Sequence, residues 1–297
     1  MTGLVHFALP EKGSRWGCLI EDTIYDITPQ VSSLSEWMKN SLGRVAESIQ
    51  DIVDYAKIAE FSYPLSDLET SPESATPHLL APVDAQEVWA AGVTYERSRS
   101  ARQEEAIDGG DIYARVYAAE RPELFFKATA KDVIGPFGKV GIRRDATWSV
   151  PEPELAVVLN PALEVVGFTI GNDMSSRDIE GANPLYLPQA KVYTASCALG
   201  PQVLLNPAKE WPEFSINLRV SRQGQIVFFG STSTNRIKRS LSDLVQYLGR
   251  SRSFPDGAVL LTGTGIVPPN EFSLQEGDLV HINIEGIGSL VNNVKIV

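Results

Sequence analysis

The sequence has few of the residues that disulfide frameworks and most structural metal sites use. Its 297 residues include two cysteines, Cys18 and Cys197, and three histidines, His6, His78 and His281. Because the cysteines lie far apart and no two histidines are close in sequence, neither a disulfide framework nor a structural zinc site is expected. Any active site should therefore use carboxylates, lysine, hydroxyl groups or a metal bound by oxygen atoms.

Positive charge is also scarce. Lys and Arg number 26 against 37 Asp and Glu, so the net charge is −11 at pH 7, and the short cluster Arg236, Lys238 and Arg239 is the main local excess. Nucleic acids and anionic membranes attract basic stretches, so neither is an expected partner. No run approaches the roughly 20 apolar residues of a membrane helix, and the N-terminus lacks a basic segment followed by an apolar one. A cytoplasmic protein is expected.

The order of patterns predicts an α+β, mainly β fold. Three β-like runs precede a stretch of helical spacing, at residues 4–9, 15–20 and 23–27, then 34–56. Residues 62–86 hold four prolines among polar residues, which is typical of a connector rather than a packed element. We expect a small N-terminal β–α domain, a proline-rich connector and a larger domain, over residues 1–70, 71–87 and 88–297.

The larger domain is predicted to consist mainly of strands. Residues 94–119 should form two helices with a break at Gly109-Gly110, and one amphipathic helix is expected over 237–248. Seven β-like runs follow Pro122, at 124–128, 154–159, 165–170, 215–220, 225–229, 259–262 and 279–284. Strands with irregular connections and few helices favour a mixed β roll or barrel over a doubly wound sheet.

Two glutamates, Glu152 and Glu154, stand two residues apart where an apolar strand begins. Residues i and i+2 of an extended chain share a face, so the two carboxylates point the same way and repel each other. A bound cation would relieve that repulsion, as would exposure to water. The pair therefore fits a metal site and a solvated strand entry equally well.

A second apolar strand, 165–170, ends in the acidic and hydroxyl-rich run 171–178. Antiparallel pairing with residues 155–159, through a hairpin at Asn160-Pro161, would bring Asp173 close to both glutamates. Three converging carboxylates suit a hard divalent cation, Mg²⁺ first and Mn²⁺ or Ca²⁺ next. On its own, Asp173 fits a turn or N-cap role better.

Two more residues gain a role only beside such a metal. A neighbouring cation would depress the pKa of Lys191 and let it act as a base near neutral pH. Glu123 begins a predicted strand, and without the metal both side chains would be ordinary surface groups. Gly263-Thr264-Gly265 lacks the lysine and spacing of a phosphate-binding loop, so a tight turn lining a pocket is predicted.

Four segments together resemble the fumarylacetoacetate hydrolase family. They are Pro-Glu-Pro-Glu-Leu-Ala-Val-Val at 151–158, Gly-Phe-Thr-Ile-Gly-Asn-Asp-Met-Ser-Ser-Arg-Asp at 167–178, Lys191, and Leu-Leu-Thr-Gly-Thr-Gly at 260–265. The resemblance extends from about Val88 to the C-terminus. It implies the family's β roll, and it implies that Glu152, Glu154 and Asp173 bind Mg²⁺.

Hydrolases and decarboxylases of that family commonly carry Gly-x-Asn-Tyr-x-x-His-x-x-Glu, whose His and Glu activate water. In the matching stretch, 92–101, Ser98 stands at the histidine position and Ala101 at the glutamate position. This departure argues against the family's usual hydrolysis. An acylpyruvate hydrolase or oxaloacetate decarboxylase with a relocated base, such as Glu104 or Glu105, is one alternative; a catalytically silent binding protein is another.

A narrower resemblance is to the 2-keto-3-deoxy-D-arabinonate dehydratase branch of the family. It rests on residues 92–96, 121–128, 183–191, Thr234-Asn235 and 246–248. It implies a Mg²⁺-dependent enzyme that converts a 2-keto-3-deoxy sugar acid, a pentonate, into 2,5-dioxopentanoate. It also implies Glu123 and Lys191 as acid and base, in either order, and a homodimer or homotetramer. The expected substrate-binding residues are Gln189, Thr264, Ser176, Gly263 and Lys127.

Overall fold

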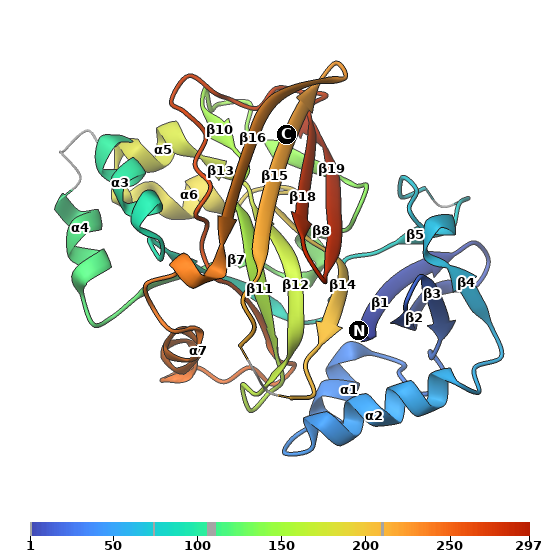
Figure 1. Cartoon of the computed structure of the whole chain (residues 1–297). Coiled ribbons are helices and arrows are strands. Elements are labelled where there is room, and N and C mark those ends of the chain that lie inside the picture. The colour runs from blue at the N-terminus through green and yellow to red at the C-terminus, as the bar shows by residue number, and fades with distance from the viewer. Residues whose placement is uncertain (1, 74, 106–110, 209–210) are drawn as a thin grey trace.

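Strands dominate the computed structural model, which describes residues 2–73, 75–105, 111–208 and 211–297 (Figure 1). The N-terminal segment contains three strands and two helices: β1 (Thr2–Leu9), β2 (Gly13–Ile20), β3 (Thr23–Asp26), α1 (Leu34–Asn40) and α2 (Val45–Ala56). β2 pairs antiparallel with both β1 and β3. Gly43, between the helices, has a φ of +71°, which glycine adopts without strain. The stretch with helical spacing is therefore split into two helices.

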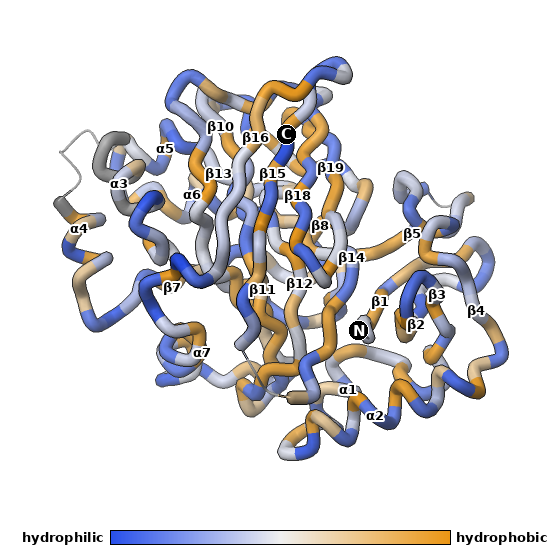
Figure 2. The backbone as a smooth tube through the Cα atoms, viewed as in Figure 1, coloured by the Kyte–Doolittle hydropathy of each residue, from blue (hydrophilic) through white to orange (hydrophobic). Residues whose placement is uncertain are grey.

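Helix α2 is amphipathic, and Figure 2 shows hydrophobic and hydrophilic residues alternating along it. Its apolar face buries Val45, Ile49 and Ile52 against the N-terminal strands and helix α1. Helix α1 begins at a serine N-cap, Ser33, whose hydroxyl accepts a hydrogen bond from the Glu36 backbone N–H. Burial of one face per helix thus attaches both helices to the sheet.

The proline-rich stretch forms two short strands, β4 (Ser62–Pro64) and β5 (His78–Leu79). β4 pairs with β3 and β5 pairs with β1, and the intervening Leu68 is buried. The prediction that residues 62–86 contain no packed element is therefore wrong. The strands are short because proline has no N–H to donate to a sheet, yet the edges of β1 and β3 offer backbone partners.

The larger part of the chain forms two further groups of strands. One group extends the N-terminal strands into a twelve-stranded sheet, and its members are β6 (Glu87–Gly92), β7 (Glu123–Ala128), β8 (Val133–Ile134), β11 (Pro153–Leu159), β12 (Val165–Asp173), β14 (Cys197–Leu205) and β17 (Ala258–Leu261). The other is a five-stranded sheet of β9 (Lys139–Ile142), β15 (Ser215–Arg222), β16 (Gln225–Ser233), β18 (Leu279–Ile284) and β19 (Gly288–Ile296). A short pair, β10 (Ser149–Val150) and β13 (Ser175–Ser176), lies beside them. This confirms the predicted mixed β fold.

Short helices connect these strands: α3 (Glu96–Glu105), α4 (Asp111–Ala118), α5 (Arg177–Ala182), α6 (Leu187–Lys191) and α7 (Leu241–Gly249). The predicted helix break at Gly109-Gly110 lies outside the described residues. Helix α7 begins four residues later than predicted, because the Ser240 hydroxyl caps it and Ile237 forms a β-bridge with Tyr95. None of the described helices is long and apolar enough to span a membrane.

Strand β11 is buried on both faces of the large sheet. Leu155, Val157 and Leu159 face one apolar core, while Ala156 and Val158 face the other. Such double burial explains the uninterrupted apolar run in the sequence. It also places the start of β11, where the glutamates stand, at the end of a strand held rigidly from two sides.

The predicted division into domains does not coincide with a break in the sheet. β1 pairs antiparallel with β14 at Gly3↔Leu204 and Leu4↔Val203, so the N-terminal strands continue the large sheet. β14 was not predicted, since Gly200-Pro201 in its middle is unfavourable for a strand. Pairing with β1 on one side and β12 on the other stabilises it. The domain division stays a prediction.

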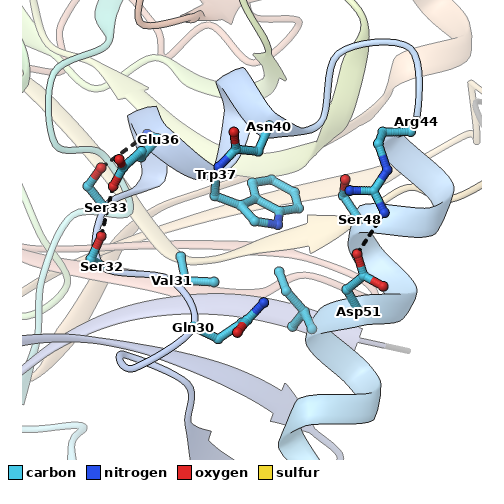
Figure 3. Close-up of a pocket in the computed structure, with 11 residues that line it drawn as sticks. Gln30, Val31, Ser32, Ser33, Glu36, Trp37, Asn40, Arg44, Ser48 and Asp51 are labelled. Carbon is cyan, nitrogen blue, oxygen red and sulfur yellow. Dashed lines mark hydrogen bonds and ion pairs between the residues drawn. The ribbon is translucent and has the colours of Figure 1, made fainter.

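The N-terminal segment also contains a polar hollow between α1 and α2, about 330 Å³ in volume (Figure 3). The indole of Trp37 extends across it from α1, and Arg44 and Asp51 form an ion pair at its rim. Trp37 and Ile52 are buried in its wall, whereas Gln30 and Asn40 are exposed. None of the residues that line the hollow belongs to β11 or β12.

Asp84 should stabilise the junction between α1 and β6. Its carboxylate accepts hydrogen bonds from the backbone N–H groups of Leu34 and Ser35 at the start of α1. We expect Asp84→Ala to lower the free energy of unfolding by about 1–2 kcal/mol, as loss of a helix cap does. Urea unfolding measures this loss. Asp54→Ala, which removes an exposed ion pair with Lys57, is the control and should change stability by less than about 0.5 kcal/mol; equal effects would contradict the capping role.

Candidate metal centre

Three acidic side chains converge where β11 and β12 meet. The two strands pair antiparallel, with Glu154 opposite Gly171, and the Asp173 N–H donates to the Glu152 carbonyl at 3.0 Å. This confirms the predicted pairing. One carboxylate oxygen from each of Glu152, Glu154 and Asp173 lies within 4.8 Å of the others. All three residues are at most 2% exposed, so water cannot disperse their charge, and the solvated alternative for the glutamate pair is excluded.

Three buried cations contact two of these carboxylates. Lys191 Nζ lies 2.6 Å from Glu152 Oε2 and 2.9 Å from Asp173 Oδ2. Lys127 Nζ lies 2.6 Å from Asp173 Oδ1, and Arg177 Nη2 lies 2.7 Å from Glu152 Oε1. Buried charges are tolerated when they are paired and hydrogen-bonded. Glu152 and Asp173 are thus each held between two cationic side chains.

Glu154 differs from its two neighbours. Its Oε2 accepts a hydrogen bond from the Gly263 N–H at 2.6 Å, and within the described ranges no Lys, Arg or His forms an ion pair with it. Burial raises the pKa of Glu154 well above its usual value, and repulsion from Asp173 and Glu152 raises it further. The Glu154 carboxylate therefore has no cationic side chain as an ion-pair partner among the described residues, and a bound metal ion would compensate its charge. The all-oxygen donor set fits a hard divalent cation.

Lys191 is placed by helix α6 and by its surroundings. Its Nζ also donates to Ser175 Oγ at 2.6 Å, and its backbone carbonyl accepts from Lys127 Nζ and Ser196 Oγ. The ammonium group lies 5.6 Å from the centre of the Phe125 ring. These contacts fix a buried lysine directly against the acidic triad.

A cavity opens beside the triad. It is lined by residues in or next to β6, β7, α3, β11, β12, α5, α6 and the turn after β17: Ala91, Gly92, Val93, Ser98, Glu123, Phe125, Glu152, Glu154, Asp173, Glu180, Lys191, Gly263 and Thr264. Glu123 and Lys191, which come from different elements, both line it. Gly92 stands opposite Glu123, and a side chain there would come within 2.1 Å of Glu123 Oε2. The glycine leaves space for that carboxylate.

The five residues expected to bind substrate divide into two groups. Gly263 and Thr264 line the cavity, as the predicted tight turn requires, and Gly263 has a φ of +90°. Gln189 is exposed and does not line it, because α6 turns its side chain outward. Ser176 and Lys127 are buried outside the lining, and Lys127 lies behind Asp173. Lys127 therefore contacts the triad, and its location favours positioning of Asp173 over contact with substrate.

The sequence reasoning did not single out Arg177 or Glu180. Both are buried, at 2% and 4% exposure, and they lie three residues apart on one face of α5. Arg177 binds Glu152, and Glu180 lines the cavity. An i, i+3 pair of charges immediately after the Asp173 strand was the signal that could have identified them.

Ser98 and Ala101 stand at the positions where hydrolases of the resembled family have the water-activating His and Glu. Ser98 is buried and lines the cavity, and Ala101 is buried on the same helix, α3. No imidazole or carboxylate therefore occupies those two positions. The side chains of Glu104 and Glu105, the alternative bases, lie outside what the structure describes.

Comparison with known proteins agrees with this geometry. The family model described as the fumarylacetoacetate (FAA) hydrolase C-terminal region matches residues 87–295. A probable 2-keto-3-deoxyxylonate dehydratase from Haloferax volcanii is 45% identical over 280 residues, which cover 93% of this chain and 94% of the relative. A 2-dehydro-3-deoxy-D-arabinonate dehydratase from Saccharolobus solfataricus is 43% identical over 218 residues, covering 72% and 73%.

A solved structure extends the similarity to nearly the whole chain. It is a 2-keto-3-deoxy-D-arabinonate dehydratase complexed with magnesium and 2,5-dioxopentanoate, with a TM-score of 0.81 and 32% identity. The match covers 99% of both chains, so it includes the N-terminal strands as well as β11 and β12, where the three carboxylates lie. With the family model matching more than half of its residues, this chain belongs to the fumarylacetoacetate hydrolase family.

Proposed function

We propose that this chain is a Mg²⁺-dependent dehydratase that converts a 2-keto-3-deoxy pentonate into 2,5-dioxopentanoate. The observation that carries the proposal is one cavity that holds three buried carboxylates, Lys191 and Glu123, with Ser98 where hydrolases of the family have histidine. Relatives at 45% and 43% identity are named as dehydratases of such sugar acids. A solved relative contains magnesium and 2,5-dioxopentanoate.

Glu152, Glu154 and Asp173 would hold the Mg²⁺ ion. When bound, the cation would accept the carboxylate and keto oxygens of a 2-keto acid as ligands and would stabilise the charge that develops as the C3 proton leaves. The protein supplies a dry, fixed site for it, because each ligand residue is at most 2% exposed and two of them are held by cationic side chains. Preorganisation of this kind lowers the cost of reaching the transition state.

Glu123 and Lys191 carry the proton transfers. One of them removes a proton from C3, and the other protonates the C4 hydroxyl as it departs, so the C3–H and C4–O bonds break and one water molecule leaves. Transfer of a proton from C5 to C3 then gives an enol, whose tautomerisation produces the C5 aldehyde. No histidine is needed, which agrees with the residues around the cavity.

The structure disfavours the hydrolase and decarboxylase alternatives. Hydrolysis needs a base that activates water, and Ser98 and Ala101 occupy the positions where the family provides it. Decarboxylation needs no activated water, but the family's decarboxylases commonly carry the same His-Glu pair, which these two positions lack. A catalytically silent protein is disfavoured too. Burying three carboxylates together with two lysines and an arginine costs stability, and such clusters of buried charge are found mostly at functional sites.

The proposal extends to assembly and location. Strand β16 lies at the edge of the small sheet and exposes Ile226, Val227 and Phe229 at 61%, 41% and 63%. Apolar edge strands are usually covered, which supports a homodimer or homotetramer. Cys18 and Cys197 are both buried free thiols, in keeping with a reducing cytoplasmic compartment.

The reaction itself is the first test. We expect purified protein to convert racemic 2-keto-3-deoxypentonate to 2,5-dioxopentanoate with Mg²⁺ and not with EDTA. Glu152→Ala and Asp173→Ala should lose activity and Mg²⁺ dependence together, because each removes a ligand. Parallel assays with an acylpyruvate and with oxaloacetate provide the comparison. Turnover of those compounds alone, or full activity in either variant, would refute the proposal.

Glu154→Gln tests whether the Glu154 carboxylate lowers the stability of the metal-free protein and binds Mg²⁺. The variant keeps an acceptor for the Gly263 N–H but removes the carboxyl group whose pKa is raised by burial and by repulsion from Asp173 and Glu152. We therefore expect a higher midpoint of thermal unfolding in EDTA and a smaller increase on adding Mg²⁺. Exposed Glu276→Gln is the matched control and should change neither. A destabilised variant that keeps the full Mg²⁺ response would show that Glu154 is not a ligand.

Hydrogen exchange at C3 should distinguish the base from the acid. Lys191→Gln and Glu123→Gln should each reduce dehydration by about 10²-fold or more. In D₂O with Mg²⁺, NMR would follow exchange of the C3 protons of 2,5-dioxopentanoate. The variant that lacks the base loses exchange, whereas the variant that lacks the acid retains it. Normal exchange in both variants would mean that another group removes the proton.

A further inference from the structure

A second hollow lies next to the catalytic cavity. It has a volume of about 720 Å³ and is lined by Tyr95, Glu96, Arg97, Ser100, Tyr117, Thr232, Asn235, Arg236, Ile237, Lys238 and Gly265. We call it the arginine vestibule. In Figure 1 the segment that follows β16 passes beside α4 before it continues into α7, and this segment contributes the basic cluster noted in the sequence.

The vestibule and the catalytic cavity share a wall. Arg97 lines the vestibule and the next residue, Ser98, lines the cavity; likewise Gly265 lines the vestibule and Thr264 the cavity. The Tyr95 ring lies in this wall, close to Gly265, where a side chain would come within 2.6 Å of the ring. The two hollows are therefore adjacent along two separate segments of the chain.

The vestibule is positively charged in a strongly negative protein. Its lining carries Arg97, Arg236 and Lys238 against Glu96, a balance of 3 − 1 = +2, while the whole chain carries −11. Lys238 donates to the Tyr117 carbonyl at 2.7 Å. Arg97 and Arg236 are exposed and form no hydrogen bond or ion pair with any part of the chain that the structure describes. Two arginines thus keep their donors available to a ligand.

Two buried hydroxyl groups lie in the wall between the vestibule and the catalytic cavity. Tyr95 is 1% exposed and Thr232 is 8% exposed, and neither Tyr95 Oη nor Thr232 Oγ1 has a hydrogen-bond partner. Buried polar groups are nearly always partnered, but both oxygens are closed to solvent, so a molecule in the vestibule would reach them only after a side-chain shift. Both residues belong to the vestibule lining. The available donors of the vestibule are therefore those of Arg97 and Arg236.

We propose that the arginine vestibule is the capture site for the substrate's carboxylate, through which the sugar acid passes into the catalytic cavity. The inference rests on the proposed function, because it takes the substrate to be a small organic anion. The overall charge of −11 repels such an anion, and a local positive field beside the cavity raises its concentration where it must enter. Arg97 and Arg236 act before the chemistry and touch no reacting atom.

A charge-matched pair of double variants tests the inference. Arg97→Gln/Arg236→Gln removes two charges from the vestibule, and Arg44→Gln/Lys57→Gln removes two exposed charges from the α2 region. For 2-keto-3-deoxypentonate, we expect the first variant to lower kcat/KM at low ionic strength by roughly threefold to tenfold. Its dependence on NaCl should also be flatter than that of the wild type. The second variant should match the wild type in both respects.

A binding measurement separates this inference from the proposed function. Calorimetry with oxalate and the Mg²⁺-loaded protein reports anion affinity without turnover, and the vestibule variant should show the same loss and flatter salt dependence. If the wild type does not dehydrate the sugar acid but oxalate binding shows this pattern, the proposed function fails and the vestibule stands. If both double variants match the wild type in oxalate affinity, or in kcat/KM at every salt concentration, the vestibule is refuted. Equal unfolding midpoints exclude a merely structural effect.

Discussion

The burial of three carboxylates within 4.8 Å of one another is the constraint on which the structure depends. Isolated ionised groups are very costly to bury, so the fold must bring compensating charges to the same place. Lys127 and Lys191 come from a strand and a short helix, and Arg177 begins another helix. All three are themselves almost completely buried. The cations compensate Glu152 and Asp173, while Glu154 has a backbone N–H and the space for a metal ion.

The large sheet holds these charged side chains in fixed positions. β11 and β12 are packed on both faces, and their antiparallel register places Glu152 and Asp173 side by side at the end of the pair. The turn after β17 contributes Gly263, and β6 and β7 contribute Gly92 and Glu123. Since strands in a packed sheet have little freedom to shift, the three carboxylates are positioned before any cation or substrate binds.

Much of the candidate site was predictable because it depends on short-range spacing. Glu152 and Glu154 share a face in any extended strand, and a hairpin between two adjacent apolar runs suffices to bring in Asp173. The contacts of Lys127 were not predictable. It lies 46 residues from Asp173 in sequence, and the side of β7 that faces the triad is set by packing. Gln189 was predicted in the site but lies outside it, since the five-residue helix α6 buries Lys191 and turns Gln189 toward solvent.

The sequence by itself determined the mainly β fold and the convergence of three carboxylates, since both depend on residue type and local periodicity. The absence of the water-activating pair follows from the resemblance to the family. Only the tertiary structure decided that Arg177 and Glu180 join the site, that the N-terminal strands continue the large sheet through β14, and that Arg97 and Arg236 flank one hollow. These features join segments that are distant in sequence. Their contacts follow from strand register and core packing, which no local pattern encodes.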